Sequence, residues 1–450
     1  MVEEARPDRG VSGSDTVYAL SSGFGRAAVA VIRVSGPAAA RVTTALVGRL
    51  PPPRQAVLAS LRAPGSRDAI DRALVVFFEG PKSFTGEDCV EFHVHGGPAV
   101  IAAMLQAFAL FDGLRPAEPG EFTRRAFENG KLDLTEVEGI ADLIEAQTEA
   151  QRRQAFRQMA GGLKQRADAW RSCILEASAM VAAEIDFADE GDVASRLDHD
   201  VAALIGPVLS DLHAELGHAR AGERLHDGLV VVIAGPPNAG KSTLLNILAR
   251  RPAAIVSATP GTTRDAIEVA LDLDGVPLTL IDTAGLRASP EEIERIGMDL
   301  ARSKAEGADL VLWLSEASAP CPPALTTSAE VWQILTKADL LAQNAAVPEG
   351  AMLLSAATGD NVDGLVARLA AFARNVTAQG QHALITRERH RLAIKRAAEA
   401  LAPLGEGRLL PVEIVAEHLR AACRALESLV GRVDVEEVLG EIFARFCVGK

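Results

Sequence analysis

The N-terminal part of the chain alternates short apolar runs with turn residues. Four of these runs have the length and side chains of strands: Tyr18–Leu20, Val29–Val34, Leu74–Phe78 and Val90–Val94. Gly and Pro residues separate them, and Ala99–Phe111 reads as a helix. The pattern predicts a mixed α/β domain over residues 1–130.

The pattern becomes helical after Leu132. Thr135 and Glu138 have the spacing of a capping box, so a helix is expected to begin there. Apolar positions keep a helical period up to Phe187, and a second helical stretch covers Val201–Arg220. These stretches predict the first half of an all-α domain, over residues 131–227.

The pattern of apolar and polar residues changes again at Gly228. Leu229–Ala234 is a continuous apolar run, and strand-like and helix-like segments then alternate to about residue 376. The helical pattern returns at Arg387–Ala402, Val412–Val430 and Val435–Phe446. We therefore expect an α/β domain with a mainly parallel sheet at 228–376, inserted into a helical domain that resumes at 377–450.

Composition narrows the class of protein. The 450 residues suggest about three domains, and 48% hydrophobic residues are typical of a globular chain. The net charge of −14 argues against coating nucleic acid by charge alone, although residues 152–171 and 387–396 are locally basic. Five scattered cysteines indicate reduced thiols, and no apolar run is long enough to span a membrane. A cytoplasmic protein without a membrane segment is expected.

The strongest motif is G-x-x-x-x-G-K-S at Gly235–Ser242, directly after the apolar run and before a helix predicted at Thr243–Ala249. In this motif backbone N–H groups face phosphates. Lys241 is expected to reach the β- and γ-phosphates and to be catalytic, and the Ser242 hydroxyl to bind Mg²⁺.

Three further segments follow strand-like runs in the order that GTPases show. Asp282–Gly285 supplies a Walker-B aspartate and a glycine that can sense the γ-phosphate. Asp339 can accept two N–H bonds from guanine, and Ser355–Ala356 can close over the base. Thr336 stands where the GTPase motif usually has Asn, so we expect guanine selectivity with lower affinity.

Hydrolysis needs a group that the Ras-like pattern does not supply here. Leu286 occupies the place of the water-orienting glutamine. Ser257–Asp265 contains threonines that can ligate Mg²⁺ and order a switch loop. Asn238 can hold a monovalent cation near the bridge between the β- and γ-phosphates. A loop-stabilising hydrogen bond is the alternative role for Asn238.

The residues expected to contact GTP share these segments. They are Gly235, Asn238, Ala239, Gly240, Lys241, Ser242, Thr243, Ser257, Ala258, Thr259, Pro260, Gly261, Thr262, Thr263, Asp282, Thr283, Ala284, Gly285, Thr336, Lys337, Asp339, Ser355 and Ala356.

Several motifs together resemble the bacterial MnmE/TrmE family of tRNA-modification GTPases. They are GPPNAGKS, GTTRD, DTAGLR and ERIG, with VIRVSG, SFTGED and PGEFTRRAF in the N-terminal part and FCVGK at the end. The resemblance covers essentially the whole chain. It implies an N-terminal α/β folate-binding domain that dimerises, a helical domain, and an inserted Ras-like P-loop GTPase domain.

The resemblance also implies ligand sets. Four residues match K⁺ ligands: Asn238, Ser257, Thr259 and Thr262. Ser242 and Thr263 match Mg²⁺ ligands, and Glu294 matches the glutamate that positions the water. Four residues match the folate site: Arg33, Glu91, Lys131 and Lys450. Cys447 matches the cysteine of the terminal motif, as a nucleophile or as a packing residue.

The implied activity is K⁺-stimulated GTP hydrolysis within a tRNA-modifying complex. Such a homodimer binds an FAD-dependent MnmG-type flavoprotein as a heterotetramer and uses NADH on that partner. The complex adds an aminomethyl or carboxymethylaminomethyl group at C5 of the wobble uridine of certain tRNAs. The one-carbon donor is 5-formyl- or 5,10-methylene-tetrahydrofolate. The alternative is a regulatory RNA-binding GTPase switch without one-carbon chemistry.

Overall fold

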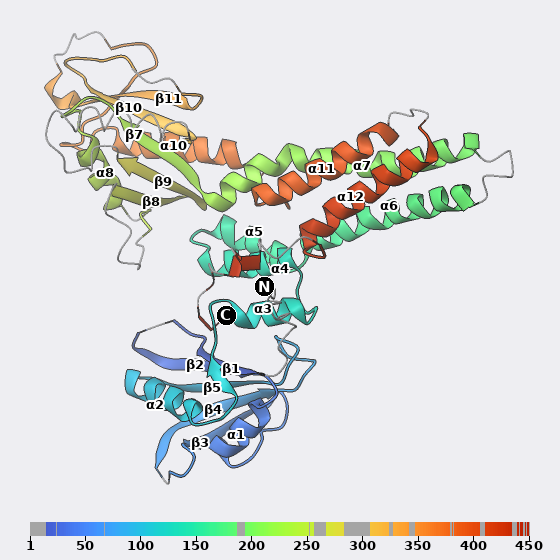
Figure 1. Ribbon diagram of the computed structural model, residues 1–450. Coiled ribbons are helices and arrows are strands. Elements are labelled where there is room, and N and C mark those ends of the chain that lie inside the picture. Colours follow the sequence, from blue (N-terminus) through green and yellow to red (C-terminus); the bar gives the residue numbers. More distant parts are fainter. Residues whose placement is uncertain are drawn as a thin grey trace, which may run out of the picture. The chain divides into compact units, whose positions relative to one another are not determined.

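The computed structural model describes residues 15–23, 25–66, 68–186, 194–251, 253–255, 267–282, 307–323, 327–341, 347–378, 380, 382–405, 410–433, 439–440, 442–443, 446 and 448–449 (Figure 1). The chain divides into two compact units. The first comprises residues 1–141 and 430–450, and the second comprises residues 142–429.

The first unit is built on a six-stranded sheet with the order β3-β4-β5-β2-β1-β6. Its strands are β1 (Thr16–Leu20), β2 (Ala27–Ser35), β3 (Ala56–Arg62), β4 (Ala69–Phe78), β5 (Cys89–Gly96) and β6 (Leu114–Pro116). All neighbours are antiparallel except β1 and β6. Helices α1 (Ala39–Val47) and α2 (Pro98–Ala109) pack on one face, where Phe92 and Phe108 are fully buried.

The four strands predicted for this unit are confirmed, within β1, β2, β4 and β5, and the predicted helix is α2. Strand β3 and helix α1 were not predicted. β3 is an edge strand that exposes Leu58 (54% exposed), so an apolar side chain stands where alternation would place a polar one.

The start of helix α4 (Leu134–Glu145) corrects the predicted capping box. Asp133 Oδ1 accepts from the Glu136 N–H at 2.9 Å, and Glu136 Oε2 accepts from the Asp133 N–H at 2.8 Å. The Thr135 hydroxyl, the expected cap, donates to the same Asp133 oxygen. The prediction of Thr135 with Glu138 was wrong because a carboxylate two residues earlier is the stronger acceptor.

The C-terminal segment belongs to the first unit. Phe443 and Phe446 pack with Val137 of α4, and Val448 forms a β-bridge with Pro119. The Ser21 hydroxyl donates to the Gly449 carbonyl at 2.8 Å. Gly449 therefore lies against the end of β1, and most of the helix predicted at Val435–Phe446 falls outside the described residues.

The second unit contains a set of long helices, which we call the helical part. They are α5 (Glu149–Met159), α6 (Gly162–Asp186), α7 (Ala194–Asp227), α11 (Glu388–Gly405) and α12 (Val412–Val430). α7 packs against both α6 and α11 (Figure 1). The helical run predicted after Thr135 is broken before Glu149 and again at Ala160–Gly161, where Gly161 has a positive φ.

The rest of the second unit is an α/β structure, which we call the sheet part. Its strands are β7 (Leu229–Ala234), β8 (Ile267–Leu273), β9 (Val276–Asp282), β10 (Leu310–Glu316), β11 (Glu330–Thr336) and β12 (Met352–Leu353). The order is β12-β11-β10-β7-β9-β8, and only β8 is antiparallel. The predicted mainly parallel sheet is confirmed.

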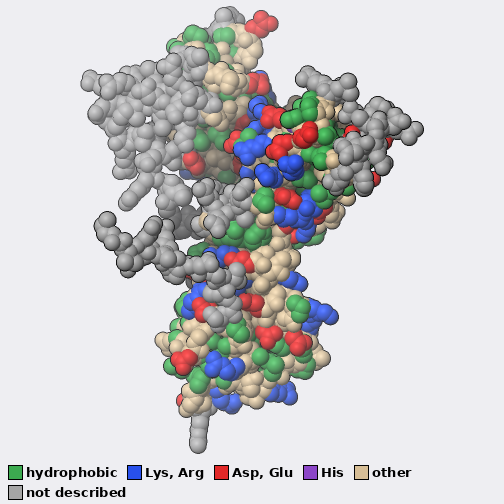
Figure 2. Space-filling model, turned by 45° about the vertical axis from the view of Figure 1, so that its right-hand side comes forward, with side chains coloured by type: hydrophobic (Ala, Val, Ile, Leu, Met, Phe, Trp, Pro, Cys, Tyr) green, Lys and Arg blue, Asp and Glu red, His purple; other side chains and the backbone are tan. Residues whose placement is uncertain are grey.

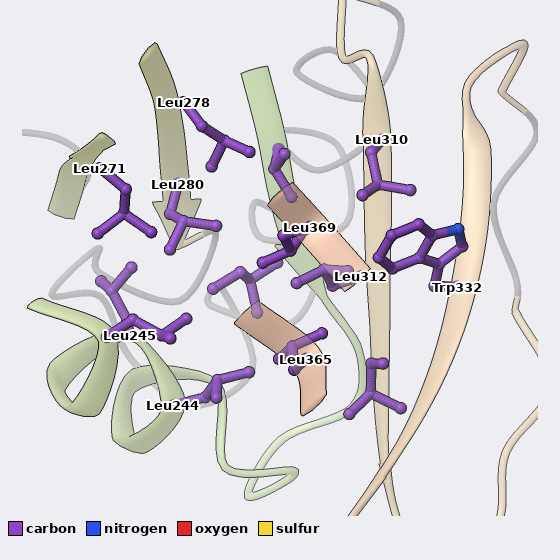
Figure 3. Packing of buried hydrophobic residues seen from close by; sticks show 14 of the residues in the cluster. Leu244, Leu245, Leu271, Leu278, Leu280, Leu310, Leu312, Trp332, Leu365 and Leu369 are labelled. Atoms are coloured by element: carbon purple, nitrogen blue, oxygen red, sulfur yellow. The ribbon is translucent and has the colours of Figure 1, made fainter. Parts of the chain in front are cut away.

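One layer of the sheet part packs leucines between the sheet and helices α8 (Lys241–Ala249) and α10 (Val362–Thr377). Figure 3 shows Leu244 and Leu245 of α8 and Leu365 and Leu369 of α10 pointing toward strand residues such as Leu280. This packing holds the carboxyl ends of the parallel strands at one edge of the sheet, where loops bind ligands in such folds.

A buried ionic network joins the sheet of the first unit to helix α3 (Glu121–Glu128). Glu121, 2% exposed, accepts from Arg115 at 2.6 Å and from Arg125 at 3.0 Å. Arg125 also donates to Glu87 of the SFTGED segment at 3.1 Å, and Glu87 accepts from Ser35 of β2. Two of the sequence motifs are therefore held together by one guanidinium.

Arg125→Met tests this network. It leaves Glu121 and Glu87 buried with one cation fewer, so the free energy of unfolding of the first unit should fall by about 3 kcal/mol. Arg124→Ala is the matched control, because the Arg124–Glu118 pair is exposed and should contribute less than about 1 kcal/mol. Calorimetry of the full chain measures both changes, and equal effects of the two variants would contradict the network.

The same network predicts a pH dependence. Burial raises the pKa of Glu121, but hydrogen bonds from Arg115 and Arg125 outweigh it and hold the pKa at about 2, below the ordinary 4.5. The stabilisation is therefore complete above pH 4.5 and is lost as the pH falls toward 2. In Arg125→Met the unfolding temperature should fall less steeply over that interval.

Candidate functional site

The loop from β7 to α8 begins with a glycine that no other residue can replace. Gly235 has a φ of 141°, and a Cβ added there would overlap the carbonyl oxygen of Leu314 in the neighbouring strand β10. Gly240, with a φ of 87°, ends the loop at the N-terminus of α8. The backbone therefore turns closely around the edge of the sheet and directs N–H groups of the helix N-terminus outward, as an anion site requires.

Lys241 and Ser242 lie at the base of this loop. The Lys241 ammonium donates to the carbonyls of Gly235 and Pro236 at 2.8 and 2.9 Å, and burial lowers its pKa although Asp282 opposes that shift. The Ser242 hydroxyl donates to Asp282 Oδ2 at 2.6 Å. A hydroxyl and a carboxylate that converge beside a cationic loop are the donor set that suits Mg²⁺ next to a phosphate.

The opposite end of the site is formed by β11 and the loop after β12. Thr336 Oγ1 lies 2.8 Å from the Ala239 carbonyl and 3.2 Å from that of Ser315, so its hydroxyl connects β11 to the phosphate loop. Asp339 Oδ1 accepts from the Ser355 hydroxyl at 2.5 Å. Lys337 pairs with Glu316 at the end of β10. The structure thus brings the predicted guanine-reading residues to the same edge as the loop.

Asn238 is exposed at the top of the loop, with a φ of 61°. Its side chain makes no hydrogen bond to any described residue, so the described part of the chain offers no support for the loop-stabilising alternative. The remaining predicted nucleotide and cation residues lie outside the described residues. They are Ser257, Ala258, Thr259, Pro260, Gly261, Thr262, Thr263, Thr283, Ala284, Gly285 and Glu294.

In the first unit, Arg33 and Glu91 face each other from β2 and β5. The guanidinium lies 2.9 Å from Glu91 Oε1, and each side chain is about one-fifth exposed. The rings of Phe84 and Phe122 lie 5.4 and 5.5 Å from the Arg33 guanidinium carbon. His93 Nε2 lies 3.4 Å from the second oxygen of Glu91. This partly exposed ion pair lies beside two aromatic rings, an arrangement that could accept a flat polar ligand.

The loop between β4 and β5 links this pair to Lys131, whose ammonium donates to the Pro81 carbonyl at 3.0 Å. Phe84, from the same loop, was not singled out by sequence reasoning, although it lies within the quoted SFTGED motif. Lys450 and Cys447 lie outside the described residues, next to Gly449 and Phe446. Cys89 lies in β5 near Arg33, and burial raises its pKa to about 12, so this thiol stays protonated.

The two basic runs of the helical part are mostly paired within the unit. Arg152 and Arg153 both pair with Glu149, Arg166 with Asp211, Arg171 with Glu427, Arg387 with Asp142 and Arg391 with Glu223. On the face that Figure 2 shows, Lys and Arg side chains are interleaved with Asp and Glu. The runs are therefore not the unopposed phosphate-binding faces that their sequence suggests.

Among the described residues, no group of three or more His, Cys, Asp and Glu side chains could hold a metal ion. Within the same residues, no helix has the length and apolar character needed to cross a membrane.

Comparison with known proteins gives a consistent result. The family model described as the MnmE helical domain matches residues 134–447, and the one described as the GTP-binding protein TrmE N-terminus matches residues 16–131. The "tRNA modification GTPase MnmE" of Beijerinckia indica is 57% identical, over 97% of this chain and 96% of its own length.

Proteins of the same name match from Rhodopseudomonas palustris and a Methylobacterium species. Each is 52% identical and covers 97% of this chain, with 99% and 100% of its own length. A solved structure of Era from Aquifex aeolicus aligns at 23% identity with a TM-score of 0.25, over 32% of this chain and 56% of Era.

Thr336 gives a test of how the site is assembled. Thr336→Val removes the hydroxyl and leaves the Ala239 carbonyl without its partner, so GDP and GTP should bind about tenfold more weakly. Thr336→Ser keeps the hydroxyl and should bind close to the wild-type chain. Titration with a fluorescent guanine nucleotide measures both, and equal affinities for Val and wild type would exclude this role.

Proposed function

The chain belongs to the MnmE family of tRNA modification GTPases, and on that premise we propose that it is the folate-dependent, K⁺-stimulated component of a wobble-uridine modifying complex. Family membership makes it a GTP hydrolase that binds GTP and Mg²⁺ and acts in tRNA modification. The observation that carries the finer proposal is the Arg33–Glu91 pair, a site about one-fifth exposed in a unit separate from the nucleotide loop.

The proposed domain organisation follows the changes in the pattern of apolar and polar residues along the sequence. Residues 1–130 form the folate-binding and dimerisation domain, 131–227 and 377–450 the helical domain, and 228–376 the inserted GTPase domain. Chain order supports this nesting, because the helices of the helical part flank the sheet part on both sides in sequence.

In the GTPase domain each residue has a separate task. The loop N–H groups and Lys241 hold the β- and γ-phosphates, and Ser242, Thr263 and Asp282 surround Mg²⁺. Glu294 orients the attacking water and accepts its proton. Four residues hold K⁺ beside the phosphates, which supplies the positive charge that an arginine finger provides elsewhere: Asn238, Ser257, Thr259 and Thr262.

In the folate domain Glu91 accepts from the amino and ring N–H groups of a pterin, and Arg33 sets the orientation of that carboxylate. Lys131 and Lys450 suit the anionic glutamyl tail. Tetrahydrofolate, as the 5-formyl or 5,10-methylene form, supplies the one-carbon unit when bound. Cys447 lies in the segment that returns to this unit, so it acts there as a nucleophile or as a packing residue.

The partners follow from the same reasoning. We propose a homodimer through the first unit, because the sheet exposes Leu58 opposite Leu74 on neighbouring strands, with 54% and 45% of each exposed. An FAD-dependent, MnmG-type partner completes the complex in the cytoplasm. Exposed cations without an ion-pair partner among the described residues are candidates for tRNA contact: Arg220, Arg396 and Arg424.

Folate binding separates this proposal from an RNA-binding switch without one-carbon chemistry. The full chain should bind 5-formyl-tetrahydrofolate, and deletion of Lys450 should weaken binding about tenfold through loss of one ion pair with the ligand carboxylate. Val448→Ala, which shortens a neighbouring exposed side chain, is the control. Calorimetric titration measures all three chains, and no affinity of the wild-type chain for either folate would favour the switch.

Cation dependence tests the role of Asn238. GTP turnover should be roughly tenfold or more faster in KCl than in NaCl at equal ionic strength, because K⁺ stabilises the developing phosphate charge. Asn238→Ala should reduce the rate in KCl to the rate in NaCl. Phosphate release measures both chains, and equal wild-type rates in the two salts would rule out a bound K⁺.

A further inference from the structure

The two chain crossings between the helical part and the sheet part meet at one carboxylate. The outgoing crossing runs from the end of α7 through Asp227 and Gly228 into β7. The returning crossing reaches α11 through Arg387. Asp142 of α4 accepts from His226 of the first crossing at 3.0 Å and from Arg387 of the second, both on Oδ1. Its side chain is only 8% exposed.

The geometry around His226 requires a charged imidazole. Nε2 faces Asp142, and Nδ1 lies 2.7 Å from Asp227 Oδ1, so both nitrogens must carry protons. Burial opposes the charge, but these two hydrogen bonds outweigh it and raise the pKa of His226 to about 9, although Arg387 opposes them. From α5, the neutral Gln151 side chain donates to the His226 backbone carbonyl.

The neighbouring charges of α7 are directed elsewhere. Glu223 pairs with Arg391 of α11, and Arg224 pairs with Asp309 beside β10. The charge balance at His226 is therefore set by Asp142, Asp227 and Arg387.

Helix α5 contacts the end of α7 through hydrogen bonds from side-chain amides. Gln151 Nε2 donates to the His226 carbonyl at 2.9 Å, and Gln154 Nε2 donates to the Gly222 carbonyl at 3.0 Å. One turn later, the Gln158 side chain accepts from Thr386 of the returning crossing. Buried hydrogen bonds of this kind fix one register between the helices, and a different register would need new partners.

The same helix also touches the sheet part, at the end of strand β9 that lies away from the nucleotide loop. The Ala150 N–H, in the first turn of α5, donates to the Gly275 carbonyl at 3.3 Å, in the turn between β8 and β9. Strand β9 ends at Asp282, which accepts from Ser242 at the proposed Mg²⁺ position. A displacement of β9 by the nucleotide at Asp282 therefore reaches α5 along the length of this strand, through the turn at its other end.

We propose that Asp142, with His226 and Arg387, forms an ionic joint that transmits the nucleotide state of the sheet part to the helical part. Asp142 is a positioning residue in this joint. Both cations use Oδ1, and the buried Oδ2 accepts no hydrogen bond from the described residues, so the carboxylate has an unused acceptor through which it can exchange partners when the hairpin moves. The proposal requires GTP binding alone, and neither folate, tRNA nor a partner protein enters its test.

Hydrogen exchange of the full chain tests the joint. With Mg²⁺ and either GDP or a non-hydrolysable GTP analogue, exchange of peptides 149–159, 220–227 and 382–388 should differ between the two nucleotides. Asp142→Asn keeps the shape and removes the charge, so it should abolish this difference while GTP turnover stays within about twofold. Glu149→Gln, which removes two exposed ion pairs on α5, is the control and should behave as wild type.

The wild-type chain provides a second arm that needs no folded variant. Deprotonation of His226 removes the joint as the pH rises through about 9, so the nucleotide-dependent difference, corrected for intrinsic exchange, should be present at pH 7 and lost at pH 10. A difference that persists in Asp142→Asn or at pH 10 overturns the proposal. Absence of any difference in the wild-type chain at pH 7 overturns it as well.

Discussion

A buried carboxylate shared by two cations is the interaction on which the assembly of this molecule depends. Among the described residues, each unit has one. Glu121 holds Arg115 and Arg125 in the first unit, and Asp142 holds His226 and Arg387 in the second. The partners of Asp142 come from distant segments of the chain, whereas Glu121 joins the end of β6 to its own helix, whose Arg125 also reaches Glu87. Apolar packing builds each layer, but these ionic contacts determine which segments meet.

The energetic role of such contacts is specificity more than stability. The attraction within a buried ion pair is little larger than the free energy needed to desolvate the two charges. Loss of one partner, in contrast, leaves an uncompensated buried charge. This asymmetry suits a nested chain. The sheet part is inserted between helices that must still find each other, and a wrong register would leave Asp142 or Arg387 buried without its partner. The leucine core between α8, α10 and the sheet has no comparable penalty for small shifts.

The sequence predicts what is local and misses what is distant. The phosphate loop follows from a continuous apolar strand and a glycine pattern, and Gly235 and Ser242 lie where that pattern places them. The cap of α4 was misassigned because two overlapping boxes compete, and only the structure shows that Asp133 accepts the hydrogen bond. Asp142 contacts His226, which is 84 positions away in the sequence, and Arg387, which is 245 positions away. No periodicity or motif spacing can reveal contacts over such distances.

The two basic runs of the helical part also show that a sequence does not reveal contacts between distant residues. Their composition favours a phosphate-binding face, yet pairs such as Arg171 with Glu427 show the cations serving to hold helices together. A sequence shows where the cations stand along the chain. Whether they are neutralised depends on which acidic side chains the fold brings next to them. Some of the acidic residues that give the net charge of −14 therefore pair with cations within the helical part. Because most cations of these runs are paired among the described residues, we propose that recognition of tRNA depends on a few isolated cations and on the surface of the proposed partner. On this proposal, a GTPase that binds its RNA mainly through a partner can release it by changing shape, and the proposed Asp142 joint would provide the means.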